Sequence, residues 1–249
     1  MSFRFDIIYE YREMFLIGAL TTLGLTFVAT LGGTLLGLVG ALARIVRFEK
    51  GGPLLKALAW LLRNVSLLYV TLFRGTPLFV QIFIWYYVWS VALIHPEHGW
   101  LVNGEQAIAM RRDYGAITAG VLALTANATA YITEIFRAGI LSIDKGQMEA
   151  ARSLGLTYPQ AMRFVILPQA FRRMLPPLAN EFITLLKETS VAGYIGIDDL
   201  TRAGQNIQAL TLEHSQPLVM VALIYLAMVL VLTELVRRLE RWLHRSRRA

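Results

Sequence analysis

Cysteine is absent from this sequence of 249 residues, which excludes disulfides and cysteine-rich metal sites. Charged residues are also scarce. They make up 16% of the chain, whereas an ordinary soluble domain carries about a quarter. Hydrophobic residues reach 56% of the total. This balance indicates a membrane protein.

Several motifs of enzymes are missing as well. The sequence has no GxxxxGK[ST] phosphate loop, so we expect no ATP binding by that route. It has no nucleophile elbow, HExxH motif or paired-carboxylate pattern, so no catalytic site is predicted. His95 and His98 have no third ligand near them in the sequence, which favours a surface role over a metal site. The N-terminus lacks the features of a secretory signal, so the first apolar segment is expected to remain in the membrane.

Five segments have the roughly 20 mostly apolar residues that a membrane-spanning helix needs. We therefore predict an all-α membrane protein with one transmembrane domain over residues 1–249 and five spans, at about 14–43, 77–94, 114–136, 174–192 and 217–236. The fourth segment is the weakest, because Glu181, Lys187 and Glu188 interrupt it. Its composition alone fits a span and a buried amphipathic helix equally well.

The placement of basic residues predicts the orientation. Five spans put the termini on opposite sides, and an N-terminus outside leaves most of the 24 lysines and arginines inside. Since inner segments of membrane proteins are enriched in these residues, we expect a cytoplasmic C-terminus. Without the fourth span, the basic tail Arg237–Arg248 would lie outside. In the cytoplasm, that tail is better interpreted as an anchor against anionic lipid than as a nucleic-acid site.

Two connecting segments are interpreted from their polar residues. Residues 53–73 are interrupted by Lys56, Arg63 and Asn64, so we expect a helix lying in the inner interface rather than a sixth span. Residues 95–113 are expected to form a solvated outer loop.

Small residues in the first span predict a close helix contact. Gly33 and Gly37 form a small-xxx-small pair, which lets helix backbones approach in lipid. Packing within the chain is favoured there over a subunit contact.

A polar stretch, residues 144–168, stands between two apolar segments. The pattern predicts a short helix, a bend at Gly155 and a second helix, with Thr157 as its cap and Pro159 in its first turn. Pro168 is expected to end that second helix. A lever of this shape can fit a groove in a partner, although an ordinary helix-turn-helix connection between spans has the same shape.

This stretch resembles the cytoplasmic EAA loop of permease subunits of ATP-binding-cassette (ABC) importers. The loop pattern is EAA, three residues, Gly, nine residues, then Ile-x-Leu-Pro; here it is matched by Glu149-Ala150-Ala151, Gly155 and Val165-Ile166-Leu167-Pro168. Val165 replaces the usual isoleucine. Further stretches are similar to the polar amino-acid branch of the family, at residues 74–77, 131–140, 146–148 and 185–190.

The resemblance implies a multi-pass subunit of a bacterial inner membrane with several partners. Two permeases, identical or homologous, would form the path, and a dimer of separate ATPase subunits would bind the ATP and Mg, so no cofactor is expected in this chain. A solute-binding protein outside would deliver the amino acid. Four residues would form the coupling contact with the ATPase: Glu149, Ala150, Ala151 and Gly155.

Ionisable side chains in spans are costly and therefore indicate function. The third and fourth predicted spans supply candidates for binding a zwitterionic amino acid: Asn127, Tyr131, Glu134, Asn180, Glu181, Thr184 and Lys187. Either glutamate would pair with the ammonium group. Asn180, Thr184 and Lys187, which share a helix face, would donate to the carboxylate. The structural alternative for Glu134 is a pair with Arg137, three residues on.

Other functions stay open at this point. An ion-driven secondary transporter or channel would carry flux without any ATPase. An ABC importer for another small amino-acid-like solute would share every motif described above. A structural scaffold would leave the glutamates and lysine within the spans unexplained.

Overall fold

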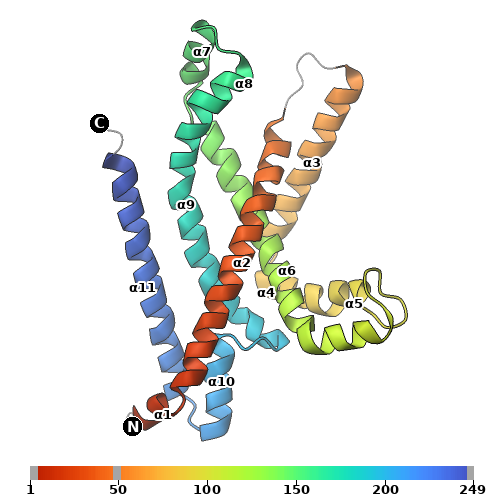
Figure 1. Ribbon diagram of the computed structural model, residues 1–249, viewed down its shortest axis with the longest axis vertical. Coiled ribbons are helices and arrows are strands. Elements are labelled where there is room, and N and C mark those ends of the chain that lie inside the picture. The colour runs from red at the N-terminus through yellow and green to blue at the C-terminus, as the bar shows by residue number, and fades with distance from the viewer. Residues whose placement is uncertain (1–4, 47–51, 246–249) are drawn as a thin grey trace.

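The computed structural model describes residues 5–46 and 52–245, and in this part of the chain every regular element is a helix. Four helices are long and apolar enough to cross a membrane: α2 (Arg12–Ile45), α3 (Pro53–Gly75), α6 (Gly104–Leu141) and most of α11 (Gln216–Arg245). They stand roughly side by side in Figure 1, with the two chain ends at opposite ends of the molecule. The spans predicted at 14–43, 114–136 and 217–236 lie within α2, α6 and α11.

The contact between α2 and α6 depends on glycine. A Cβ atom on Gly33 would lie 2.8 Å from the Cβ of Ala128, and one on Gly37 would lie 2.9 Å from Cγ2 of Ile132. Both distances are too short for any larger residue, so the backbones meet where side chains are missing. The prediction that this glycine pair packs within the chain is confirmed.

The helix α3 corrects the sequence-based assignment of residues 53–73. It runs beside α2 in Figure 1 instead of across the bundle, and it is held there by two hydrogen bonds. Ser66 Oγ donates to the Gly40 carbonyl (2.9 Å), and Tyr69 donates to the Ala126 carbonyl (2.6 Å). Asn64 donates to the carbonyl of Trp60 in its own helix (2.7 Å), which lowers the cost of a polar side chain on an apolar helix.

The span predicted at 77–94 forms three short helical pieces: α4 (Leu78–Ile84), a π-helical turn (Trp85–Trp89) and α5 (Ser90–Leu93). Together they are shorter than a spanning helix, and they lie across the long helices in Figure 1. The solvated loop expected from residue 95 to 113 ends early, because α6 begins at Gly104 and buries Ala107. Five spans remain a prediction, with α3 now a stronger candidate than 77–94.

The region of the EAA loop consists of α7 (Lys145–Ser153), α8 (Tyr158–Ala161), a π-helical turn (Met162–Ile166) and α9 (Leu167–Glu188). The prediction that Pro168 ends a helix is wrong. Pro168 lies in the first turn of α9, directly after the π-helical turn, where the altered hydrogen-bond register accommodates a residue without an N–H donor. The predicted fourth span, 174–192, lies on α9 and the following 3₁₀ helix (Thr189–Ile195).

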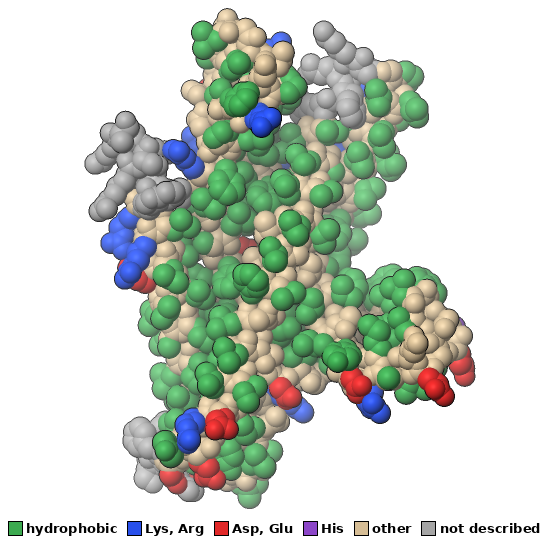
Figure 2. Space-filling view, in the orientation of Figure 1, with side chains coloured by type: hydrophobic (Ala, Val, Ile, Leu, Met, Phe, Trp, Pro, Cys, Tyr) green, Lys and Arg blue, Asp and Glu red, His purple; other side chains and the backbone are tan. Residues whose placement is uncertain are grey.

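At the other end of the molecule, α1 (Phe5–Glu10) and α10 (Leu200–Thr211) pack against α2 and α11. The carboxylate of Asp199 is buried and caps α10 by accepting from the Arg202 N–H (2.9 Å). Figure 2 shows hydrophobic side chains over most of the middle of the visible face, with charged side chains mainly toward the two ends. Of the basic residues that predict the orientation, Arg4, Arg47, Lys50, Arg247 and Arg248 lie outside the described residues.

Candidate functional site

Helix α7 is a short helix with both ends capped. At its start, Asp144 accepts a hydrogen bond from the Gly146 N–H (2.7 Å). At its end, Gly155 adopts a φ of +86°, a conformation that glycine enters without steric cost. This allows the Leu156 N–H to reach the Ala151 carbonyl (3.2 Å) and closes a Schellman motif. The predicted bend at Gly155 is confirmed.

The EAA residues themselves point in different directions. Ala151 is buried, and Met148 on the same face packs against the core. Glu149 and Ala150 are exposed, and Leu154 is 84% exposed. Ala151 therefore packs α7 against its own chain, while Ala150 lies on the exposed face of the helix.

A side-chain hydrogen bond joins α7 to the start of α9, because Gln169 donates to the side-chain oxygen of Gln147 (3.1 Å). Arg173 of α9 donates to the carbonyl of Ser142 at the end of α6. Thr157 starts α8 with a capping box, because its N–H donates to Gln160 (2.8 Å). In Figure 1, α7 and α8 lie together above the upper ends of α2, α6 and α11, at the end of the molecule opposite α1. One side-chain hydrogen bond therefore links α7 directly to α9.

Asn127 is buried in a polar network that holds α3, α4 and α6 together. Its amide donates to the side-chain oxygen of Gln81 (2.9 Å), and Gln81 in turn donates to the Phe73 carbonyl (2.8 Å) and to Thr76 Oγ1 (2.8 Å). Nothing in the sequence pattern indicates Gln81, since a single glutamine in an apolar run gives no periodic signal. This geometry gives Asn127 a structural role.

Glu134 is already paired with two arginines. Arg44 of α2 donates to Oε2 (2.6 Å), and Arg137 donates to Oε1 from the next turn of α6. The pair with Arg137 was one predicted alternative, whereas Arg44 was not foreseen. Nearby, the guanidinium of Arg74 lies over the ring of Tyr131, 5.1 Å from its centroid. A carboxylate held by two arginines has little capacity left for an ammonium group.

The four polar residues of α9 do not join this group around α6. Asn180, Thr184 and Lys187 are exposed along one face of α9, as their spacing predicts. Glu181 is half-buried and makes no ion pair or hydrogen bond with any described residue. Asn127, Tyr131 and Glu134 of α6 therefore contact side chains of other helices, whereas Asn180, Thr184 and Lys187 lie on an exposed face of α9 beside the half-buried Glu181.

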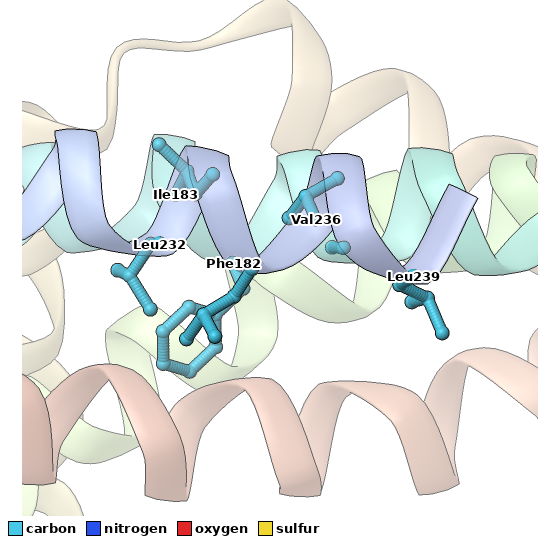
Figure 3. A pocket seen from close by; sticks show the side chains of 7 residues that line it. Phe182, Ile183, Leu232, Val236 and Leu239 are labelled. Carbon is cyan, nitrogen blue, oxygen red and sulfur yellow. The ribbon is translucent and has the colours of Figure 1, made fainter. Parts of the chain in front are cut away.

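A cavity of about 230 Å³ lies between α9 and α11. Figure 3 shows Phe182 and Ile183 of α9 and Leu232, Val236 and Leu239 of α11 around it, and its lining is almost entirely apolar. A zwitterion placed there would lose its hydration without gaining partners. The cavity is therefore not the substrate site.

Metal ligands do not gather in the part of the chain that the structure describes, where no cluster of three or more His, Asp or Glu side chains occurs. His95 and His98 stack with their ring centroids 3.7 Å apart. This pair has the surface location that the sequence predicts, at the turn between α5 and α6.

Comparison with known proteins gives a consistent result. The family described as "Binding-protein-dependent transport system inner membrane component" matches residues 54–245. The glutamine transport system permease protein GlnP of Escherichia coli K12 is 36% identical over 97% of this chain and 98% of its own length. The arginine transport system permease protein ArtQ of Bacillus subtilis is 34% identical, with 97% of both chains covered.

Solved structures agree with these relatives. A chain of an amino acid ABC transporter with histidines aligns with a TM-score of 0.78 and 37% identity, covering 97% of this chain and 99% of its own. A chain of the methionine ABC transporter MetNI in an inward-facing conformation aligns with a TM-score of 0.64 at 21% identity, which supports the fold alone. This chain, with its projecting EAA loop, belongs to the family of binding-protein-dependent transport system inner membrane components and is a permease subunit of an ABC importer.

Proposed function

We propose that this permease imports polar amino acids, driven by a dimer of separate ATPase subunits that bind ATP and Mg. The observation that carries the coupling role is the geometry of α7, a capped helix that projects from one end of the molecule and is hydrogen-bonded to α9. The substrate class is supported by relatives named for glutamine and arginine transport. The end bearing α7 faces the cytoplasm, with the C-terminus inside and the N-terminus outside.

In this proposal the ATPase receives the exposed face of α7. Leu154 enters an apolar depression, and Glu149 pairs with a basic or N–H donor at its rim. Ala150 is small enough for close approach, while Ala151 and Gly155 fix the angle at which α7 leaves its own chain. Closure of the ATPase on ATP draws the two coupling helices together, and hydrolysis releases them.

The open polar face of α9 borders the substrate path. A second permease, identical or homologous, completes the path against Asn180, Thr184 and Lys187, which this chain alone leaves exposed. Glu181 is the free acid for the substrate ammonium, because Glu134 is already paired. A solute-binding protein delivers the amino acid at the end that carries α1 and α10.

A single-cysteine cross-link tests the coupling role. The chain has no cysteine, so Glu149→Cys provides one thiol in this subunit, and Glu105→Cys at the opposite end provides a matched control. We expect the thiol at position 149 to cross-link to an ATPase subunit in the purified complex and the thiol at position 105 to give no such product. Cross-linking to the ATPase from both positions, or from neither, would refute the proposed docking.

Uptake by proteoliposomes tests the substrate class. The complex, with its binding protein, is given labelled glutamine, arginine and histidine with and without ATP. ATP-dependent uptake of at least one is expected. Uptake that depends on an ion gradient and not on ATP would favour a secondary transporter. Failure to take up any of the three amino acids would contradict the polar amino-acid assignment.

A further inference from the structure

Arg74, at the C-terminal end of α3, is a cation without an acidic partner. Its side chain is exposed and makes no ion pair with any described residue, although its guanidinium lies over the Tyr131 ring. Arginine in a membrane-spanning segment is costly and is normally paired or functional. The absence of a partner therefore needs an explanation.

The end of α3 is also held unusually firmly. The carbonyls of Phe73 and Thr76 both accept from the amide of Gln81, at 2.8 and 3.0 Å, and Gln81 accepts from Asn127 of α6. Asn127 is one helical turn from Tyr131 on α6. The buried network thus fixes the backbone of Arg74 close to the ring that its side chain covers, which is the kind of support that a binding group requires.

Two carboxylates interact electrostatically with Arg74, and they differ in whether they are already paired. Its charge acts on both Glu134 and Glu181. Glu134 is neutralised by Arg44 and Arg137, whereas Glu181 on α9 is unpaired. An unpaired guanidinium on α3 and an unpaired carboxylate on α9 are therefore close enough to interact electrostatically, without an ion pair between them. A zwitterion offers one group of each sign to such a pair.

We propose that Arg74 binds the α-carboxylate of the transported amino acid, with Tyr131 supporting the guanidinium and Glu181 facing the substrate ammonium. This inference rests on the proposed amino-acid import and adds a residue outside the candidates predicted from sequence. It moves the carboxylate contact from the exposed face of α9 to the end of α3. The side chain of the substrate then projects toward the second permease, where selectivity among amino acids is decided.

A purely structural role predicts something different. A cation in the last turn of α3 also stabilises the helix dipole. In that case any substitution would lower stability modestly, a positive charge would restore it, and substrate would have no effect on access to position 74. Protection by substrate is therefore the observation that separates the two roles.

Protection by substrate can be measured as the rate at which a thiol introduced at position 74 is modified, because the chain has no native cysteine. Arg74→Cys is compared with Arg63→Cys, which removes the same residue type from an exposed position earlier on α3. The probe is the amino acid that the unaltered complex takes up in proteoliposomes. Each variant is treated with 2-aminoethyl or 2-sulfonatoethyl methanethiosulfonate, and the cysteine-free chain with the same reagents reports any effect on partner subunits.

We expect Arg74→Cys to lower uptake by about ten- to a hundredfold, the effect of losing a charge-assisted hydrogen bond, with ATPase activity retained. The cationic reagent should restore uptake and the anionic one should not. The amino acid should slow modification of the thiol at position 74 but leave modification at position 63 unaffected. Unchanged uptake by Arg74→Cys, equal rescue by both reagents, or absence of protection would each overturn the inference. If the unaltered complex takes up no amino acid, the proposed function has failed and the inference falls with it.

Discussion

The bend at Gly155 offers a quantitative test of how the coupling helix works. Its φ of +86° is disfavoured for any residue with a Cβ, yet a Cβ placed there meets no atom within 4 Å. Substitution at this position therefore changes conformational energy without causing a clash. The cost is about 1–2 kcal/mol for an ordinary L-residue in the left-handed region, and less for asparagine, which tolerates this conformation.

This cost predicts an order of coupling efficiency that is independent of size. A penalty of 1–2 kcal/mol corresponds to roughly a 5- to 30-fold loss in the population of the bent loop. We expect the ratio of amino-acid uptake to ATP hydrolysis to fall in the order Gly, Asn, Ala, Val at position 155. Because the Schellman bonds of α7 depend on the bend, α7 should lose its fixed angle while the long helices stay folded.

The assay measures uptake and ATP hydrolysis in the same proteoliposomes. Gly24→Ala is the matched control, because a Cβ added at Gly24 also meets no atom within 4 Å, but this glycine lies in the interior of α2 without a positive φ. It should leave coupling unchanged. If Gly155→Asn couples less well than Gly155→Ala, side-chain size rather than backbone conformation controls the loop and the reasoning above is refuted.

Three further predictions concern stability, measured as thermal unfolding of the purified complex. Gly33→Leu should destabilise by at least about 1–3 kcal/mol through overpacking against α6, and normal stability would contradict the close helix contact. Arg44→Gln should cost less than Glu134→Gln, because the first leaves Glu134 paired with Arg137 while the second leaves two arginines without an acid; the reverse order would contradict this account. Burial raises the pKa of Asp199 from 3.8 to about 6, so the folded chain retains a proton that the unfolded chain releases, and this contribution to stability falls as pH rises from about 4 to 6. The Asp199→Asn variant should retain the cap on α10, and its stability should no longer show this pH dependence. If the pH dependence is unchanged in the variant, other titratable groups cause it.

Long apolar runs and one loop motif were enough to predict much of the fold. The runs that became α2, α6 and α11 contain few polar residues, so composition predicted their positions directly. The glycine bend was predictable as well, because a polar helix pair with a glycine between its halves requires a conformation that other residues avoid. The positions of these helices and of the glycine bend depend on residues close together in the sequence, which is why they could be predicted.

The error at α3 has a definite physical cause. On a hydropathy scale, Lys56, Arg63 and Asn64 each lower the predicted tendency of this segment to span a membrane. In the structure, these three side chains have different surroundings. Asn64 bonds to its own helix backbone, and the two basic side chains are exposed. A sequence pattern assigns each polar residue a cost without showing what satisfies it, so the three interruptions favour a helix at the interface, whereas α3 runs beside α2.

The candidate site was harder to predict because its pairings cross the fold. Helical spacing showed correctly that Asn180, Thr184 and Lys187 share a face of α9. It gave no sign that Glu134 would meet Arg44, 90 residues earlier in the chain. Only the packing of α2 against α6 brings these two residues together. Which acid is free and which is already paired therefore depends on tertiary structure.

The arrangement of helices joins the coupling loop to the proposed substrate site. The helix α7 is hydrogen-bonded to the start of α9, and α9 carries Glu181 toward its other end. Arg74 belongs to the opposite part of this site and is fixed to α6 through the network around Gln81. A movement of α7 that shifts α9 against α6 would therefore change the distance between the two charges that we propose to hold the substrate. Under the proposed function, the coupling helix would thus act on substrate affinity through α9.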